Sequence, residues 1–421
     1  KLFLKNSRSY VNLKKRIILS YIMRKETFML FSLTLIFLLG IVLGSIFNRL
    51  KLPQLLGMLL TGIILGPYLL NLLDPKILSI STDLRQIALI IILTRAGLNL
   101  DINDLKKVGR PAVLMCFVPA TFEILGMIIF APKFLGLGLL DSAILGTVIA
   151  AVSPAVVVPK MLKLMEDGYG TEEGIPQLIM AGASVDDVFV IVLFTSFIGL
   201  ASNGTFSALN LIKIPTSIFF GISAGFLCAI LLIYLFKKVH VRDSLKVIII
   251  LNISFLLVTF EHSLTGIIGF SGLLAIMSMG TGIQEKNNIL AKRLSAKYSK
   301  LWIAAEVMLF VLVGATVNIK YALGASIPAI LLIMTVMVFR MVGVFLCLLG
   351  TSLSYKERLF CMIAYCPKAT VQAAIGSIPL SMGLSSGNII LTVAVLSILI
   401  TAPLGAFAID FSYKKLLNRK L

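Results

Sequence analysis

The chain has 421 residues, of which 58% are hydrophobic and 14% are charged, and its formal net charge is +19. Soluble proteins contain about 45–50% apolar residues, so this composition and a mean hydropathy of +1.02 exclude an ordinary soluble fold. The basic residues lie in short loops beside apolar stretches, which favours anionic lipid headgroups over nucleic acid as a partner. The sequence has neither a phosphate-binding Walker loop nor an H-E-x-x-H motif, and nothing in it indicates a cofactor or an enzyme.

Long apolar stretches follow one another through residues 28–410, which we expect to form one membrane domain. Lipid offers the backbone no hydrogen-bond partners, so continuous stretches of about 20 residues indicate transmembrane helices. The sequence predicts an all-α polytopic membrane protein with about thirteen such helices. Their predicted positions are roughly 28–47, 55–72, 84–98, 111–130, 139–161, 174–199, 214–236, 245–260, 264–283, 299–317, 321–350, 356–380 and 388–409.

Basic residues of the loops indicate the orientation, because Lys and Arg are retained on the cytoplasmic side. The basic tail 411–421 and the loops near 237–242 and 286–300 fall on one side, so we expect a cytoplasmic C-terminus in the cell membrane. The opposite loops hold only Lys76, Arg85, Lys133, Lys213 and Lys320. An odd number of crossings would place the basic segment 1–27 outside, so we interpret that segment as interfacial or as a misassigned start.

Two neighbouring carboxylates, Asp186 and Asp187, lie in the middle of an apolar stretch. An ionisable group at bilayer depth costs about 2.5–3.5 kcal/mol on insertion scales, so its presence points to function. Both groups cannot stay ionised in a low dielectric without a counter-charge. Consecutive helix residues point about 100° apart, so one can face an aqueous cavity while a partner holds the other. The pair therefore predicts a site for a proton and a cation; a solvent-exposed pair at a helix end is the alternative.

Two deep cations, Arg340 and Lys368, are available as counter-charges, and Glu123 is a further deep carboxylate. A guanidinium does not deprotonate, so Arg340 must be paired or solvated, and we expect it beside Asp186 or Asp187. Glu123 and Lys368 then remain, and we predict that they form a second ion pair.

Helix breakers interrupt two of the predicted spans. Pro154 and Pro159 lie in the fifth span, and Pro367 and Pro379 lie in the twelfth. Each proline removes a backbone hydrogen bond, although kinks in a purely structural bundle would have the same cause. An offset of seven spans makes the two segments run in opposite directions, as in inverted-topology repeats with two crossed discontinuous helices. We expect the ion site between them, with Lys368 offsetting the partial charge of their C-terminal ends.

Several of these segments carry a family likeness. They are 94–98 (TRAGL), 151–159 (AVSPAVVVP), 168–170 (GYG), 184–187 (SVDD), 367–377 (PKATVQAAIGS) and 396–403 (LSILITAP). From about residue 28 to the C-terminus, the chain resembles the sodium/proton antiporters of the cation:proton antiporter superfamily, and most closely the NHA-type branch.

The resemblance implies a homodimer in which a core domain with two crossed, discontinuous helices moves against a dimerisation domain. It implies that Asp187 binds the proton and, transiently, the metal ion Na⁺ or Li⁺. It further implies the ion pairs Asp186–Arg340 and Glu123–Lys368. The discontinuous-helix residues expected at the site are Ser153, Pro154, Thr370 and Gln372.

The expected function is secondary antiport, in which a monovalent cation and a proton exclude each other at Asp187. One alternative is a sodium-coupled symporter of an organic anion on a related fold. An intramembrane aspartyl protease is a second alternative, but its two carboxylates come from different helices, whereas Asp186 and Asp187 are consecutive.

Overall fold

The computed structural model describes residues 29–50, 52–100, 109–202, 208–264 and 269–419, so the predicted N-terminal segment lies outside it. Within those residues every regular element is a helix, which confirms the all-α prediction. Nine of the described helical stretches are long and apolar enough to cross a membrane. The helices are α2 (Met29–Arg49), α3 (Gln54–Leu65), α4 (Pro75–Ser79), α5 (Ser81–Asn99), α7 (Arg110–Met115), α8 (Val118–Leu135), α9 (Leu139–Ile149), α10 (Pro154–Glu166), α11 (Ile175–Ser202), α12 (Ala208–Lys238), α13 (Asp243–Leu264), α14 (Gly272–Lys286), α15 (Asn288–Ala315), α16 (Ile319–Cys347), α17 (Tyr355–Ala364), α18 (Thr370–Ile375), α19 (Ile378–Ser381) and α20 (Gly387–Leu416).

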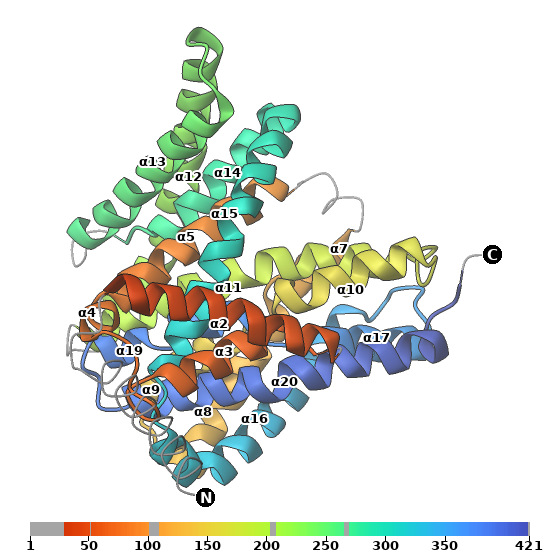
Figure 1. The fold of residues 1–421 in the computed structure, drawn as a ribbon. Coiled ribbons are helices and arrows are strands. Elements are labelled where there is room, and N and C mark those ends of the chain that lie inside the picture. Colours follow the sequence, from red (N-terminus) through yellow and green to blue (C-terminus); the bar gives the residue numbers. More distant parts are fainter. Residues whose placement is uncertain (1–28, 51, 101–108, 203–207, 265–268, 420–421) are drawn as a thin grey trace, which may run out of the picture.

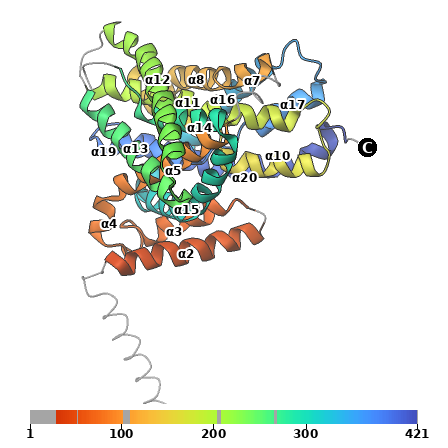
Figure 2. The ribbon, with the colours of Figure 1, turned by 90° about the horizontal axis from the view of Figure 1, so that it is seen from above.

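The helices pack in two groups (Figure 1). A scaffold group contains α2, α3, α5 and α12 to α15, and a core group contains α7 to α11 and α16 to α20. In the core group, α10, α17 and α20 end together at the right of Figures 1 and 2. Most helix contacts join members of one group, so the two groups meet along a boundary with fewer contacts.

Glycines set the closeness of the scaffold packing between α3 and α15. A Cβ atom added at Gly62 would lie 1.9 Å from the carbonyl oxygen of Val311, and one added at Gly314 would lie 2.1 Å from that of Leu59. Small residues allow helix backbones in a membrane to approach this closely. The two helices therefore interlock, and the scaffold can act as a rigid support.

The fifth and twelfth predicted spans are both interrupted in the middle of the core group, as the prolines indicated. Residues 150–153 separate α9 from α10, and residues 365–369 separate α17 from α18. Pro154 is the first residue of α10, and Ser153 before it is extended with φ −90° and ψ 109°, the conformation that proline imposes on its predecessor. A further interruption, between α7 and α8 at residues 116–117, was not predicted.

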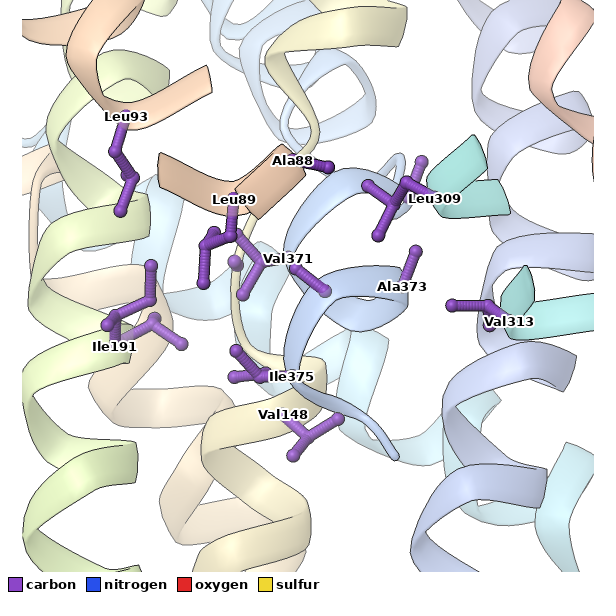
Figure 3. Close-up of a cluster of buried hydrophobic side chains, with 14 of the residues drawn as sticks. Ala88, Leu89, Leu93, Val148, Ile191, Leu309, Val313, Val371, Ala373 and Ile375 are labelled. Carbon is purple, nitrogen blue, oxygen red and sulfur yellow. The ribbon is translucent and has the colours of Figure 1, made fainter. Parts of the chain in front are cut away.

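An apolar seam joins the two groups where α18 packs against α5 and α15 (Figure 3). We call it the α18 seam; it consists of Ala88, Leu89, Leu309, Val313, Val371, Ala373 and Ile375, all buried. Dispersion contacts in such a seam hold the core against the scaffold without any charge.

Candidate ion-binding site

The two interruptions touch each other. The Ser153 backbone N–H donates a hydrogen bond to the Pro367 carbonyl oxygen at 2.8 Å. Gln372 Nε2 donates to the carbonyl oxygens of Ile149 at 3.0 Å and Ala151 at 2.9 Å. These carbonyl oxygens lie where α9 ends, so no backbone N–H of the same helix donates to them. They therefore need a donor from another part of the chain. The expected crossing of two discontinuous helices is therefore present.

Arg340 of α16 lies at the crossing with no exposed surface. Its Nη2 is 2.8 Å from Asp186 Oδ2, and its Nη1 is 2.9 Å from Glu123 Oε2. It also donates to the carbonyl oxygens of Tyr365, at 2.6 Å, and Ala150. The guanidinium thus joins two carboxylates to the C-terminal ends of two half-helices.

Lys368 lies in the second interruption and is also fully buried. Its Nζ is 2.7 Å from Glu123 Oε1 and 2.8 Å from Glu123 Oε2. The expectation that Lys368 would offset the C-terminal helix ends is wrong, because Arg340 and Gln372 occupy those carbonyls. A full carboxylate charge attracts the ammonium more strongly than the partial charge of a helix end.

The two consecutive aspartates have different surroundings. Asp186 is fully buried, and its Oδ2 accepts hydrogen bonds from Arg340 and from the Val152 backbone N–H, the latter at 2.8 Å. Asp187 is partly exposed, and its buried Oδ1 has no hydrogen-bond partner among the described residues. Asp186 is therefore held in place, whereas Asp187 remains free to take a ligand.

Buried oxygen atoms without a hydrogen-bond donor gather at the same interruptions. Besides the two aspartates, Ser153 Oγ, Thr370 Oγ1 and Gln372 Oε1 are such atoms in the described part of the chain. Ser153 stands at the N-cap of α10, next to Pro154, but its hydroxyl does not cap the helix. Hard cations prefer oxygen ligands, and antiporter-type sites use unwound backbone and side-chain oxygens for Na⁺. The donor set thus fits a dehydrated monovalent cation as substrate.

The site carries one surplus negative charge when all its groups are ionised. Glu123, Asp186 and Asp187 give −3, and Arg340 and Lys368 give +2, so the sum is −1. Because Arg340 and Lys368 pair with Glu123 and Asp186, the unbalanced negative charge is that of Asp187. A single proton or a single monovalent cation neutralises it.

A polar cavity of about 590 Å³ lies beside the start of α10, next to the first interruption. Its walls include Ala155 and Val156 at the start of α10, Lys160 farther along α10, Glu306 of α15 and Asp410 of α20. Lys160 and Asp410 form an ion pair of 2.5 Å at its wall. On the opposite side lies the α18 seam, which is apolar and closed. The two sides of the crossing therefore differ, since one carries a polar cavity and the other a buried apolar seam.

Two crossed, interrupted helices around a carboxylate with one surplus charge define a secondary transporter for a small cation. Residues 30–413 match the family model described as "Sodium/hydrogen exchanger, transmembrane". The chain belongs to the sodium/hydrogen exchanger family and is an integral membrane protein.

Relatives match over most of their length. Human sodium/hydrogen exchanger 9B2 is 34% identical over 415 residues, which cover 93% of this chain and 75% of the exchanger. Human sodium/hydrogen exchanger 9B1 is 31% identical over 413 residues, covering 93% of this chain and 78% of the exchanger.

The fold also matches that of a solved antiporter. The sodium proton antiporter MjNhaP1 from Methanocaldococcus jannaschii superposes with a TM-score of 0.80 at 23% identity, covering 91% of this chain and 97% of that chain. The expected antiporter architecture is thereby confirmed.

Proposed function

We propose that the protein exchanges Na⁺ or Li⁺ for H⁺ across the membrane and that the two ions compete for Asp187. The observation that carries this proposal is the surplus charge on Asp187, whose Oδ1 has no partner within the described residues. Membership of the sodium/hydrogen exchanger family and the names of the relatives support Na⁺ and H⁺ as substrates.

Competition by itself couples the two fluxes. When Asp187 is ionised and empty, closing the polar cavity would bury an uncompensated charge, which is costly in a low dielectric. When a cation or a proton neutralises it, that cost disappears and the core can shift against the scaffold. A cation that binds must first displace the proton, so each cycle exchanges one for the other.

The stoichiometry follows from which carboxylates titrate. Asp186 is fixed by Arg340 and by the Val152 N–H, and Glu123 is fixed by Arg340 and Lys368. If these contacts persist through the cycle, only Asp187 exchanges, and transport moves one proton per cation without net charge. A second exchanging carboxylate would move charge, worth about 2.3 kcal/mol per charge per 100 mV. Currents on solid-supported membranes test this point.

We further propose that the protein lies in the cell membrane with its C-terminus and the polar cavity facing the cytoplasm. The cavity wall includes Asp410 near the end of α20, just before the basic tail. We also propose a homodimer formed by scaffold groups, with anionic lipids at the basic cytoplasmic loops. Native mass spectrometry with and without added anionic lipid tests the dimer and its lipid binding.

Proteoliposomes that contain a pH-sensitive dye test the exchange itself. Na⁺, Li⁺ and K⁺ are added in turn to the native chain, to Asp187→Ala and to the control Asp83→Ala, whose carboxylate is exposed. We expect a cation-driven pH change for the native chain and the control, and none for Asp187→Ala. A pH change that survives Asp187→Ala would exclude the mechanism, and Na⁺ uptake coupled to an organic anion without a pH change would favour the symporter.

A further inference from the structure

Arg85 is a buried cation that neither the sequence prediction nor the proposed exchange uses. The sequence placed it in a loop, but it lies in the second turn of α5 and is only 3% exposed. No ion pair with a carboxylate is found for it within the described parts of the chain. A side chain that snorkels at the end of a span would be exposed, so burial argues against that explanation.

The partners of Arg85 are neutral oxygens. Its Nε donates to the Ser81 carbonyl oxygen at 3.0 Å, and its Nη2 is 3.1 Å from Thr82 Oγ1, both on its own helix. Its Nη1 donates to the Ser377 hydroxyl, which lies between α18 and α19. This third hydrogen bond joins the scaffold group to the core group.

Ser377 stands at the end of the segment that must move. It follows Ile375 of the α18 seam by two residues, and α18 also carries Thr370 and Gln372 of the ion site. By contrast, the hydrogen bond from Ser386, at the start of α20, to Asp141 of α9 at 2.9 Å joins two elements of the core group. It would not change when the core group shifts against the scaffold group.

We propose that Arg85 is a positioning residue for transport, whose hydrogen bond to Ser377 holds α18 against the scaffold while the ion site opens to the opposite side. This inference rests on the proposed exchange function. A buried guanidinium requires acceptors or water at every donor. When α18 leaves α5, water entering the seam replaces the Ser377 hydroxyl. In intermediate positions of α18, the Arg85 guanidinium would have neither the Ser377 hydroxyl nor water as an acceptor. The intermediate positions are therefore less stable than the two end arrangements.

Loss of this hydrogen bond shifts the balance toward the arrangement that is open on the α18 side, which is the outer side in the proposed orientation. A hydrogen bond to a charged group stabilises a state enough that its removal changes the population ratio about tenfold. We expect this shift for Arg85→Gln and for Ser377→Ala. Arg85→Lys keeps the charge but has a single donor nitrogen in place of three, and we expect it to restore part of the native balance.

Cysteine labelling from outside the cell reads the position of α18 directly. Ala373 of the α18 seam has no exposed surface, so Ala373→Cys, with the five native cysteines replaced, reports opening of the seam to a membrane-impermeant maleimide. We expect Arg85→Gln and Ser377→Ala to raise the labelling rate about tenfold. The control Ser386→Ala is expected to leave the rate unchanged.

Unchanged labelling in both variants would overturn the proposal. If Arg85→Gln does not reach the membrane, Ser377→Ala alone decides, since it removes a single hydroxyl. A second readout is the KM for Na⁺ added outside, which is expected to fall in Ser377→Ala and to rise for Na⁺ added inside. Labelling needs no transport, so faster labelling without any cation-driven pH change in proteoliposomes would refute the exchange function but not the contact.

Discussion

Arg340→Gln removes the residue that joins the two carboxylates to both broken helices. Among the described residues, Asp186 then keeps only the Val152 N–H as a hydrogen-bond donor, whereas Glu123 retains Lys368. Taking one partner from a buried ion pair costs about 3–5 kcal/mol, because the remaining charge is left uncompensated. We expect the thermal midpoint of the purified protein, followed by fluorescence-detected size-exclusion chromatography, to fall steeply.

Two further variants make this test specific. Arg293→Gln removes an arginine whose side chain is 56% exposed and which pairs with Asp243 at 3.2 Å; such surface pairs contribute about 0–1 kcal/mol. The double variant Arg340→Gln with Asp186→Asn removes both charges and is expected to regain much of the lost stability. Equal midpoints for the two single arginine variants, or a double variant no more stable than Arg340→Gln, would refute the reasoning.

Three other outcomes are expected. Gln372→Ala leaves two buried carbonyls at the end of α9 without donors, at a cost of about 1–3 kcal/mol in the same thermal assay, and an unchanged midpoint would contradict this role. Gly62→Ala drives a methyl group into the α15 backbone and should abolish the folded peak, whereas Gly199→Ala, with nothing within 4 Å, should gain up to about 1 kcal/mol of helix propensity. If protons and Na⁺ compete, the apparent KM for Na⁺ rises up to about tenfold for each unit by which the pH falls, with no change in maximal rate; a fall in rate at constant KM would argue against competition.

The charged residues of the site could be found in the sequence because apolar surroundings make them conspicuous. Glu123, Arg340 and Lys368 each stand alone in a long apolar stretch, and the structure brings all three together with Asp186. Which cation meets which carboxylate could not be predicted in full, since Arg340 contacts both Asp186 and Glu123. That arrangement depends on where α8 and α16 cross, and hydropathy carries no information about crossings.

The prolines predicted the broken helices, because proline acts on its own backbone and on the residue before it. Local patterns do not show which donors satisfy the freed carbonyls, and the assignment of Lys368 to that role failed for this reason. Arg85 was misplaced because the predicted span began within a residue of it. A charged residue near the end of an apolar stretch is interpreted as a loop residue, because the sequence does not show which neighbouring segment buries it.

The exchange of one bound ion for the other at Asp187 can be measured directly as proton release on Na⁺ binding. Isothermal titration calorimetry in buffers of different ionisation enthalpy gives the number of protons released per Na⁺ bound, at a pH where Asp187 is protonated. We predict about one proton per Na⁺ for the native protein and no Na⁺-linked release for Asp187→Asn. Na⁺ binding without proton release, or release that persists in Asp187→Asn, would contradict the competition mechanism.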